Sequence, residues 1–172
     1  KYASVVAEAV NKTRDLVNTP PNVATPEYIA NYAKELAKKS NLKCRVFDDK
    51  QIEKMKMGCF FAVGKGSINK PRLVVLDYNG AKGKKPIALV GKGVTFDSGG
   101  LNLKPYPYIL NMKDDKGGAL ASIHIIEACS KLKLPVNLVV ITPLCENMID
   151  ADSYRPDDVL TAYNGTTVEI KN

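Results

Sequence analysis

The chain has 172 residues, 25 Lys and Arg against 18 Asp and Glu, a net charge of +7, and 45% apolar residues. This length and composition predict one globular domain, or most of one, which needs no disulfide or metal to hold its core. The longest apolar runs fall far short of the roughly 20 residues of a membrane span. Glu8, Asn11 and Lys12 interrupt what would be the apolar part of a signal peptide. We therefore expect no membrane or secretory segment.

Histidine and cysteine usage narrows the chemistry. His124 is the only histidine, which excludes sites built on two or more imidazoles. The cysteines are far apart and form no CxxC pair, so we expect reduced, mostly buried thiols at Cys44, Cys59, Cys129 and Cys145. Metal chemistry would therefore depend on carboxylates.

The positive charge is unevenly distributed, with +9 in residues 1–86 and −2 in residues 87–172. Lysine supplies 21 of the 25 basic side chains, whereas arginine is the usual reader of base edges and phosphate groups. The composition therefore favours a solvated lysine-rich face over specific nucleic-acid recognition.

In chain order, helical spacing first predicts a helix over Tyr2–Val17. The connector Asn18–Asn22 follows, and then Thr25-Pro26-Glu27, a helix start with an N-cap hydroxyl, leads to a helix that ends near Lys39. A short helix is predicted over Lys50–Met57, with Gly58 as its stop, and a longer one over Gly118–Leu132. Short β-branched runs predict strands at Lys43–Phe47, Phe60–Val63, Arg72–Tyr78, Ile87–Val90 and Val136–Ile141.

The last three of these strands are apolar on both faces, which is typical of interior strands in a sheet that helices cover on both sides. The predicted class is therefore α/β. Turn residues at Asn79-Gly80 and Gly83–Pro86 favour a hairpin between the strands Arg72–Tyr78 and Ile87–Val90, which makes the sheet mixed.

The segment most informative about function is Val90–Pro105, followed by Met112–Gly118. It begins at the carboxyl end of a predicted strand, where open α/β sheets bind ligands, and its glycines allow the backbone to approach a ligand closely. Asp97 and Asp115 are oxygen donors suited to divalent cations. On residue chemistry alone, a surface salt-bridge network and a metal or anion site both remain open.

The motifs themselves resemble one family, the leucyl aminopeptidases, which are dinuclear-metal exopeptidases. VGKGVTFDSGG at 90–100, LKP at 103–105 and MKDDKGGA at 112–119 are similar to its hallmark segments. Glu146-Asn147-Met148, Arg155–Leu160, Asn164–Ile170 and the connector Arg14–Asn22 also fit. The resemblance implies a three-layer sandwich with a mixed, mostly parallel sheet. Residues 1–22 would be a linker helix and connector, and residues 23–172 the N-terminal part of the catalytic domain.

Carried over by position, the resemblance makes Asp97 the carboxylate that bridges two metal ions, with Lys92 and Asp115 completing the tighter site. Lys104 would be catalytic and would polarise the scissile carbonyl. Asp115 would bind the substrate's free amine, and Met112 would line the pocket for its first side chain. The implied reaction removes N-terminal residues, preferably leucine, from peptides by means of a metal-bound hydroxide, with two Zn, Mn or Co ions as cofactors.

In the family, the segment NTDAEGR supplies two further metal carboxylates and an arginine that holds a bicarbonate. Asn172 aligns with its first residue, so this chain would be incomplete at its C-terminus and inactive alone. The resemblance also implies a cytoplasmic homohexamer. Five residues at three places depart from the family pattern: Lys116 replaces methionine, Tyr106-Pro107-Tyr108 replaces smaller residues, and Asp157 replaces a glycine. An alternative is a non-catalytic binding or assembly module, or a basic relative that binds nucleic acid, whose duplex binding would depend steeply on salt.

Overall fold

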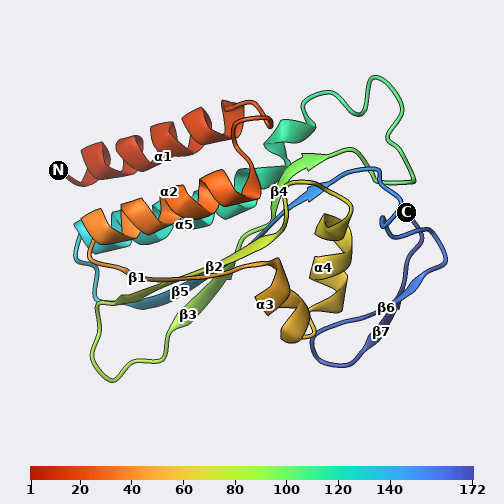
Figure 1. Ribbon diagram of the computed structural model, residues 1–172. Helices are drawn as coiled ribbons and strands as arrows, with labels where there is room; N and C mark the ends of the chain where they lie inside the picture. The colour runs from red at the N-terminus through yellow and green to blue at the C-terminus, as the bar shows by residue number, and fades with distance from the viewer.

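The computed structural model describes residues 1–172, and its elements follow one another along the whole chain (Figure 1). No helix is both long and apolar enough to cross a membrane. The helices are α1 (Tyr2–Asn18), α2 (Pro26–Lys39), α3 (Asp49–Lys54), α4 (Gly58–Lys65), the 3₁₀ helix η1 (Met112–Lys116) and α5 (Gly117–Lys131). The strands are β1 (Lys43–Phe47), β2 (Arg72–Asn79), β3 (Ile87–Val90), β4 (Gly93–Asp97), β5 (Asn137–Asn147), β6 (Val159–Thr161) and β7 (Thr167–Glu169).

Strand β5 is the common partner of the main sheet. It pairs antiparallel with β2 and parallel with both β3 and β4, while β1 pairs antiparallel with the outer side of β2. The sheet is therefore mixed, as predicted. The hairpin expected between β2 and β3 is wrong, because β5 lies between these two strands. The turn residues between them make a wider connection across β5 instead.

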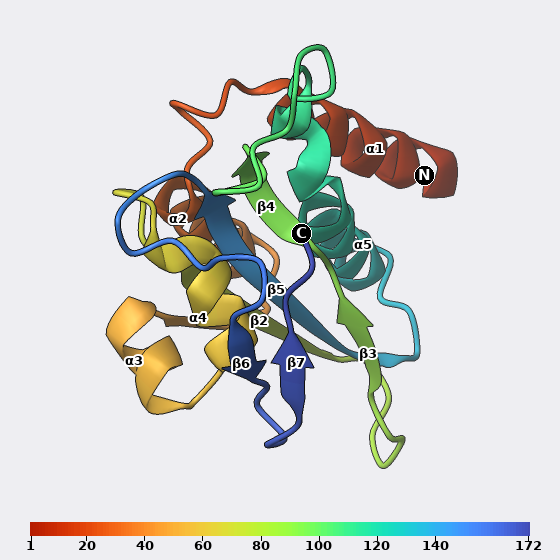
Figure 2. The same ribbon diagram turned by 90° about the vertical axis from the view of Figure 1, so that its right-hand side faces the viewer.

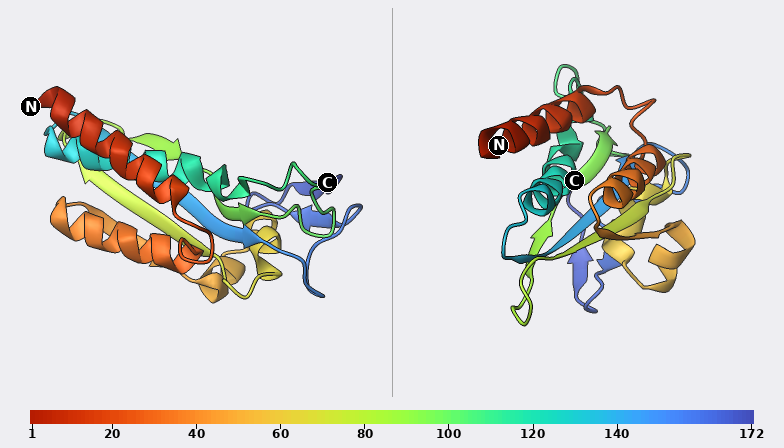
Figure 3. Two further views of the ribbon diagram at one scale, coloured as in Figure 1. Left: turned by 90° about the horizontal axis from the view of Figure 1, so that it is seen from above. Right: turned by 90° about the vertical axis from the view of Figure 1, so that its left-hand side faces the viewer.

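The protein has three layers, with α2 and α5 over one face of the sheet and α3 and α4 over the other, while α1 packs on the outside of α5 (Figures 1 and 2). Alternation along the strands builds both cores. In β2, Val74 and Leu76 pack under α2 and α5, whereas Leu73 and Val75 pack with Ile52 of α3 on the opposite face. The two chain ends lie at opposite ends of the molecule (Figure 3). The predicted α/β class is confirmed.

Several predicted elements differ from the structure. The strand expected at Phe60–Val63 lies within helix α4, which begins at Gly58, the residue expected to end a helix. A short apolar run cannot be assigned to helix or strand by its periodicity alone. Strands β4, β6 and β7 were not predicted. Strand β3 is an edge strand rather than an interior one, and its Ile87 and Val90 are 56% and 71% exposed.

A polar network joins the three long helices. His124 of α5 is fully buried, and its two ring nitrogens lie 2.8 Å from the Thr13 hydroxyl of α1 and 2.8 Å from the Tyr32 hydroxyl of α2. The Tyr32 ring meets the imidazole edge to face. Next to them, Glu127 of α5 accepts a 2.8 Å hydrogen bond from Lys12 of α1. His124 is thus a packed helix residue, as expected, and ties α5 to both neighbouring helices.

Two lysines attach the α1–α2 connector to η1. Lys116 is fully buried, and its ammonium donates to the backbone oxygens of Thr19 at 3.2 Å and Lys113 at 2.6 Å. Lys113 in turn donates to the Asn18 backbone oxygen at 3.2 Å. Burial lowers the pKa of Lys116 to about 8, because an ammonium loses solvation when no carboxylate pairs with it. The connector is therefore held by a buried ammonium group, whose lost solvation lowers the stability of the fold.

Titration of His124 should make the stability of the fold decrease as the pH falls below about 6.5. Burial lowers the pKa of His124, so the unfolded chain takes up a proton before the folded one, and stability is lost as the pH falls from about 6.5. The free energy of unfolding should fall by up to about 1.4 kcal/mol per pH unit in this range. Urea unfolding of the wild type and of His124→Gln at several pH values measures this. Parallel profiles for the two proteins would contradict the prediction.

Replacing Lys116 by methionine, the residue that the resemblance leads us to expect there, should stabilise the fold. Lys116→Met removes a buried charge at little change in volume, and we expect the free energy of unfolding at pH 7 to rise by about 1 kcal/mol. The gain should shrink above pH 8, because the wild-type lysine then loses its proton in the folded state but keeps it in the unfolded state up to about pH 10.5. Lys113→Met, which alters a half-buried neighbour, is the control. A loss of stability in Lys116→Met would contradict this account.

Candidate functional site

The site lies at one edge of the main sheet, where β4 and β5 end and the connection from β3 to β4 passes. Strands β4 and β5 run parallel, so their carboxyl ends meet at the same edge, which is where α/β sheets place ligands. Lys92 follows β3, Asp97 ends β4, and Asn147 ends β5. Helix η1, which carries Asp115, lies beside the end of β4 (Figure 1). Residues separated by up to 55 positions in the sequence are thus brought to one place.

Close backbone contact fixes Lys92 against the start of α5. The amide of Ala119 donates to the Lys92 backbone oxygen at 2.7 Å. A Cβ at Gly91 would stand 2.5 Å from the backbone oxygen of Gly118 and 2.7 Å from the Cα of Ala119, so only glycine permits this approach. The pair Gly91 and Gly118 therefore sets how near the β3–β4 connection comes to the segment that carries Asp115.

Asp97 is held by three groups. Its Oδ1 accepts hydrogen bonds from Asn147 Nδ2 at 2.8 Å and from the Gly99 amide at 3.0 Å, and its Oδ2 lies 3.2 Å from the Lys104 ammonium. Burial raises the pKa of Asp97, but the bonds from Asn147 and Gly99 and the ammonium of Lys104 outweigh it, so the pKa lies below its ordinary value. Asp97 is consequently an anion at neutral pH.

Asp115 is held on one side only. Its Oδ1 lies 2.9 Å from the ammonium of Lys92, whose side chain is largely exposed, while its Oδ2 is buried with no hydrogen-bond partner. A buried carboxylate oxygen without a partner is costly unless something else satisfies it. This oxygen is the clearest indication that the site takes a further cation or donor.

Cys145 lies within electrostatic reach of both acids of the site, Asp97 and Asp115. The thiol lies on β5 opposite Val94 of β4 and is buried. Burial, and to a smaller extent the carboxylates of Asp97 and Asp115, together raise its pKa to about 12, although Lys92 opposes them. Both carboxylates therefore act on one buried side chain, and the thiol stays protonated and unreactive. This agrees with the structural role expected for Cys145.

A cavity of about 230 Å³ opens beside Asp97. It is mostly polar, and its lining includes Lys104, Asn147, Tyr154 and Asn172. Burial raises the pKa of the Tyr154 hydroxyl, so this group remains a neutral donor and acceptor. A polar cavity next to a held carboxylate has the character of a small-ligand site.

The four charged residues predicted from the motifs lie in two ion pairs at this edge, Lys92 with Asp115 and Asp97 with Lys104. Met112 begins η1 and is half-buried, and it does not line the polar cavity. Tyr106 and Tyr108 lie on an exposed loop after Lys104 and are 79% and 73% exposed. Asp157, in the glycine position, has a φ of 71°, so the turn does use the left-handed backbone that glycine favours.

Sequence reasoning missed two residues of the site, Asn147 and Tyr154, which line the cavity with Asp97. The motif Glu146-Asn147-Met148 was visible, but nothing in it indicated that the amide would reach Asp97. No group of three or more His, Cys, Asp or Glu side chains is arranged to hold a metal ion. The donors available in this chain are therefore two carboxylates and two lysine amines.

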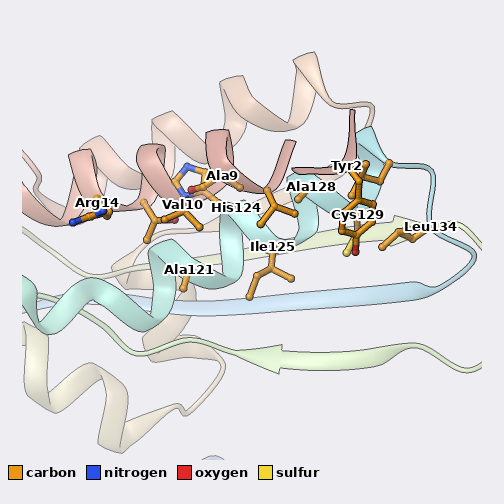
Figure 4. Close-up of a pocket in the computed structure, with 13 residues that line it drawn as sticks. Tyr2, Ala9, Val10, Arg14, Ala121, His124, Ile125, Ala128, Cys129 and Leu134 are labelled. Carbon is orange, nitrogen blue, oxygen red and sulfur yellow. Dashed lines mark hydrogen bonds between the residues drawn. The ribbon is translucent and has the colours of Figure 1, made fainter. Parts of the chain in front are cut away.

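Two other hollows do not carry comparable chemistry. An apolar one of about 380 Å³ lies between α1 and α5 and is lined by such side chains as Val10 and Ile125, with few polar groups directed into it (Figure 4). A larger one, of about 600 Å³, lies at the opposite end of the sheet and includes Lys39 and Lys131. These lysines stand in the last turns of α2 and α5, where the helix dipole attracts cations, which gives them a structural explanation.

Comparisons with known proteins agree with this arrangement. The profile of the cytosol aminopeptidase family, catalytic domain, matches residues 11–172. A probable cytosol aminopeptidase of Wolinella succinogenes is 50% identical over 98% of this chain and 35% of its own length. One from Persephonella marina is 49% identical over all of this chain and 35% of its own length. A solved structure, the bottromycin maturation enzyme BotP in complex with Mn, superposes with a TM-score of 0.90 at 41% identity, over 96% of this chain and 36% of BotP.

The chain thus spans about a third of the length of the relatives that it matches. The matched residues include the whole sheet edge with both Lys–Asp pairs. The chain is about half identical to two of these relatives over nearly its whole length, and it shares the fold of BotP. The chain therefore belongs to the cytosol aminopeptidase family.

Proposed function

We propose that the complete protein is a metal-dependent aminopeptidase that removes N-terminal residues from peptides, leucine preferentially. The observation that carries this proposal is the buried, unpartnered Oδ2 of Asp115 beside a second held carboxylate, Asp97, at the carboxyl edge of the sheet. Membership of the cytosol aminopeptidase family and the Mn bound in BotP support it. This chain supplies part of the site and should be inactive alone.

The donor chemistry fits divalent cations in part. Asp97 and Asp115 offer carboxylate oxygens, which Mn, Zn and Co accept as ligands, and Lys92 can add a nitrogen once its amine is neutral. Two carboxylates are too few for a pair of ions, so we propose that further carboxylates follow Asn172 in the complete protein. We propose two divalent ions, which would supply Lewis acidity and lower the pKa of a water molecule when bound.

The remaining roles fall to this chain's own side chains. The Lys104 ammonium, now paired with Asp97 Oδ2, would donate to the carbonyl oxygen of the scissile bond and stabilise the negative charge that develops there. Asp115 would accept a hydrogen bond from the substrate's N-terminal amine. Met112 would supply apolar contact to the first side chain, which requires that its end of η1 face the substrate.

Other features of the family extend the proposal. We propose a cytoplasmic homohexamer, with a bicarbonate held by an arginine that follows Asn172 as general base. Residues 1–22 would link an N-terminal part to the catalytic domain that begins at residue 23. In keeping with this, the α1–α2 connector is held against η1 by Lys113 and Lys116.

Removing Asp97 should abolish both metal binding and activity. Asp97→Ala in the full-length protein should lower hydrolysis of a leucyl amide by at least about 100-fold, since a metal ligand is lost, and should lower the bound Mn measured by elemental analysis. Lys82→Ala, on an exposed turn, is the matched control and should change neither. Full activity of Asp97→Ala would sink the proposal.

Lys104 should affect catalysis but not metal content. Lys104→Met removes a donor to the developing oxyanion, and we expect kcat for leucyl amide to fall by about 100- to 1,000-fold, with bound Mn unchanged. Steady-state kinetics and metal analysis of the same preparation separate the two effects. If Mn is lost in parallel with activity, Lys104 acts on the metal site and not on the carbonyl.

A further inference from the structure

We infer that Asn147, at the end of β5, is a positioning residue that orients the Asp97 carboxylate for the metal site. The inference rests on the proposed function and adds a residue to it. Asn147 contributes no charge and need not touch substrate. Its effect would pass entirely through the carboxylate that it holds.

The backbone places the two residues opposite each other. Strands β4 and β5 pair in register at Gly93–Leu144 and Val94–Cys145, and then the register shifts so that Asp97 lies opposite Asn147. Three residues of β4 therefore span the same length as two of β5, which is a β-bulge. Bulges near the ends of strands redirect side chains, and this one brings the acid and the amide to the same edge.

The two carboxylate oxygens of Asp97 have different kinds of partner. Both neutral donors, Asn147 Nδ2 at 2.8 Å and the Gly99 amide at 3.0 Å, are directed at Oδ1, whereas Oδ2 meets only the Lys104 ammonium at 3.2 Å. One oxygen is thus fixed by uncharged groups, and the other is left for a cation. The carboxylate cannot rotate without giving up the bond to Asn147.

Asn147 is itself immobilised. It is 5% exposed, and its backbone oxygen accepts bonds from the Ser98 amide at 3.0 Å and the Ser98 hydroxyl at 2.7 Å. Its amide oxygen faces Gly100, where an added Cβ would stand 3.0 Å away. The loop Ser98–Gly100 therefore holds the Asn147 backbone oxygen through Ser98 and lies against the side-chain amide oxygen at Gly100, which leaves the amide nitrogen directed at Asp97.

An asparagine suits this position for a chemical reason. A buried amide supplies an N–H donor without adding charge, so it holds Asp97 as an anion and leaves the net charge of the site to the metal ligands. An aspartate would keep the shape but remove the donor and place a second negative charge 2.8 Å from the first. Groups that orient metal ligands in this way typically change metal affinity or activity by about 10- to 100-fold when removed.

The test uses the full-length protein and two variants of one side chain. Asn147→Ala removes the amide, and Asn147→Asp keeps its shape without the donor. Mn affinity is measured by the electron paramagnetic resonance signal of free Mn²⁺, and kcat and KM for leucyl amide are measured at saturating Mn²⁺. We expect both variants to bind Mn about 10- to 100-fold more weakly than the wild type, with KM little changed.

Asn137→Ala is the matched control, because Asn137 is a buried asparagine at the other end of β5 whose side chain bonds only backbone groups: it donates to the oxygens of Ala81 and Lys84 and accepts from the Ala81 amide. It should lower stability in urea and leave Mn affinity unchanged. A general loss of packing would instead weaken Mn binding equally in Asn137→Ala, which overturns the inference. Wild-type Mn affinity in Asn147→Asp also overturns it, while leaving the proposed function intact. A wild-type protein that binds no Mn overturns both.

Discussion

The fold and the site both depend on β5. This strand of 11 residues pairs with β2, β3 and β4, so it supplies the centre of both hydrophobic cores and also the edge at which the charged residues meet. In its first half, successive apolar side chains face the two helix layers in turn, so both faces of the strand are apolar. Its last residues, Cys145 to Asn147, are buried as well, and two of them, Cys145 and Asn147, lie next to the carboxylates of the site. One strand therefore passes from the core into the site.

Charge burial at this edge explains the local arrangement. Asp97 is stabilised from both sides by donors and a lysine, whereas Asp115 is satisfied at one oxygen alone. Near the protonated thiol, one buried carboxylate oxygen, Oδ2 of Asp115, is thus left without a partner. A divalent cation would satisfy it, because each lysine here contacts only one oxygen of its acid.

Lysine stands at position 116, where the resemblance leads us to expect methionine, and the structure explains how the lysine is accommodated. The side chain extends to backbone oxygens of the α1–α2 connector and so turns an apolar packing position into a polar attachment. The cost of the buried ammonium is reflected in its lowered pKa. Asp157 also stands where the resemblance leads us to expect another residue, glycine. Its φ of 71° lies in the left-handed region that glycine adopts most readily.

The sequence by itself determined the α/β class, the long helices, the interior strand β2 and the first half of β5, since these follow from periodicity. The choice of Lys92, Asp97, Lys104 and Asp115 as site residues came from the resemblance of their motifs to one family, and their roles stay predictions. Tertiary structure decided the rest. Whether Phe60–Val63 became helix or strand depended on the sheet face that it covers, and β5 entered between β2 and β3 because strand pairing is a long-range choice. The partner of Asp97 could not be read from the motifs, because the bulge that places Asn147 opposite it exists only once β4 and β5 pair.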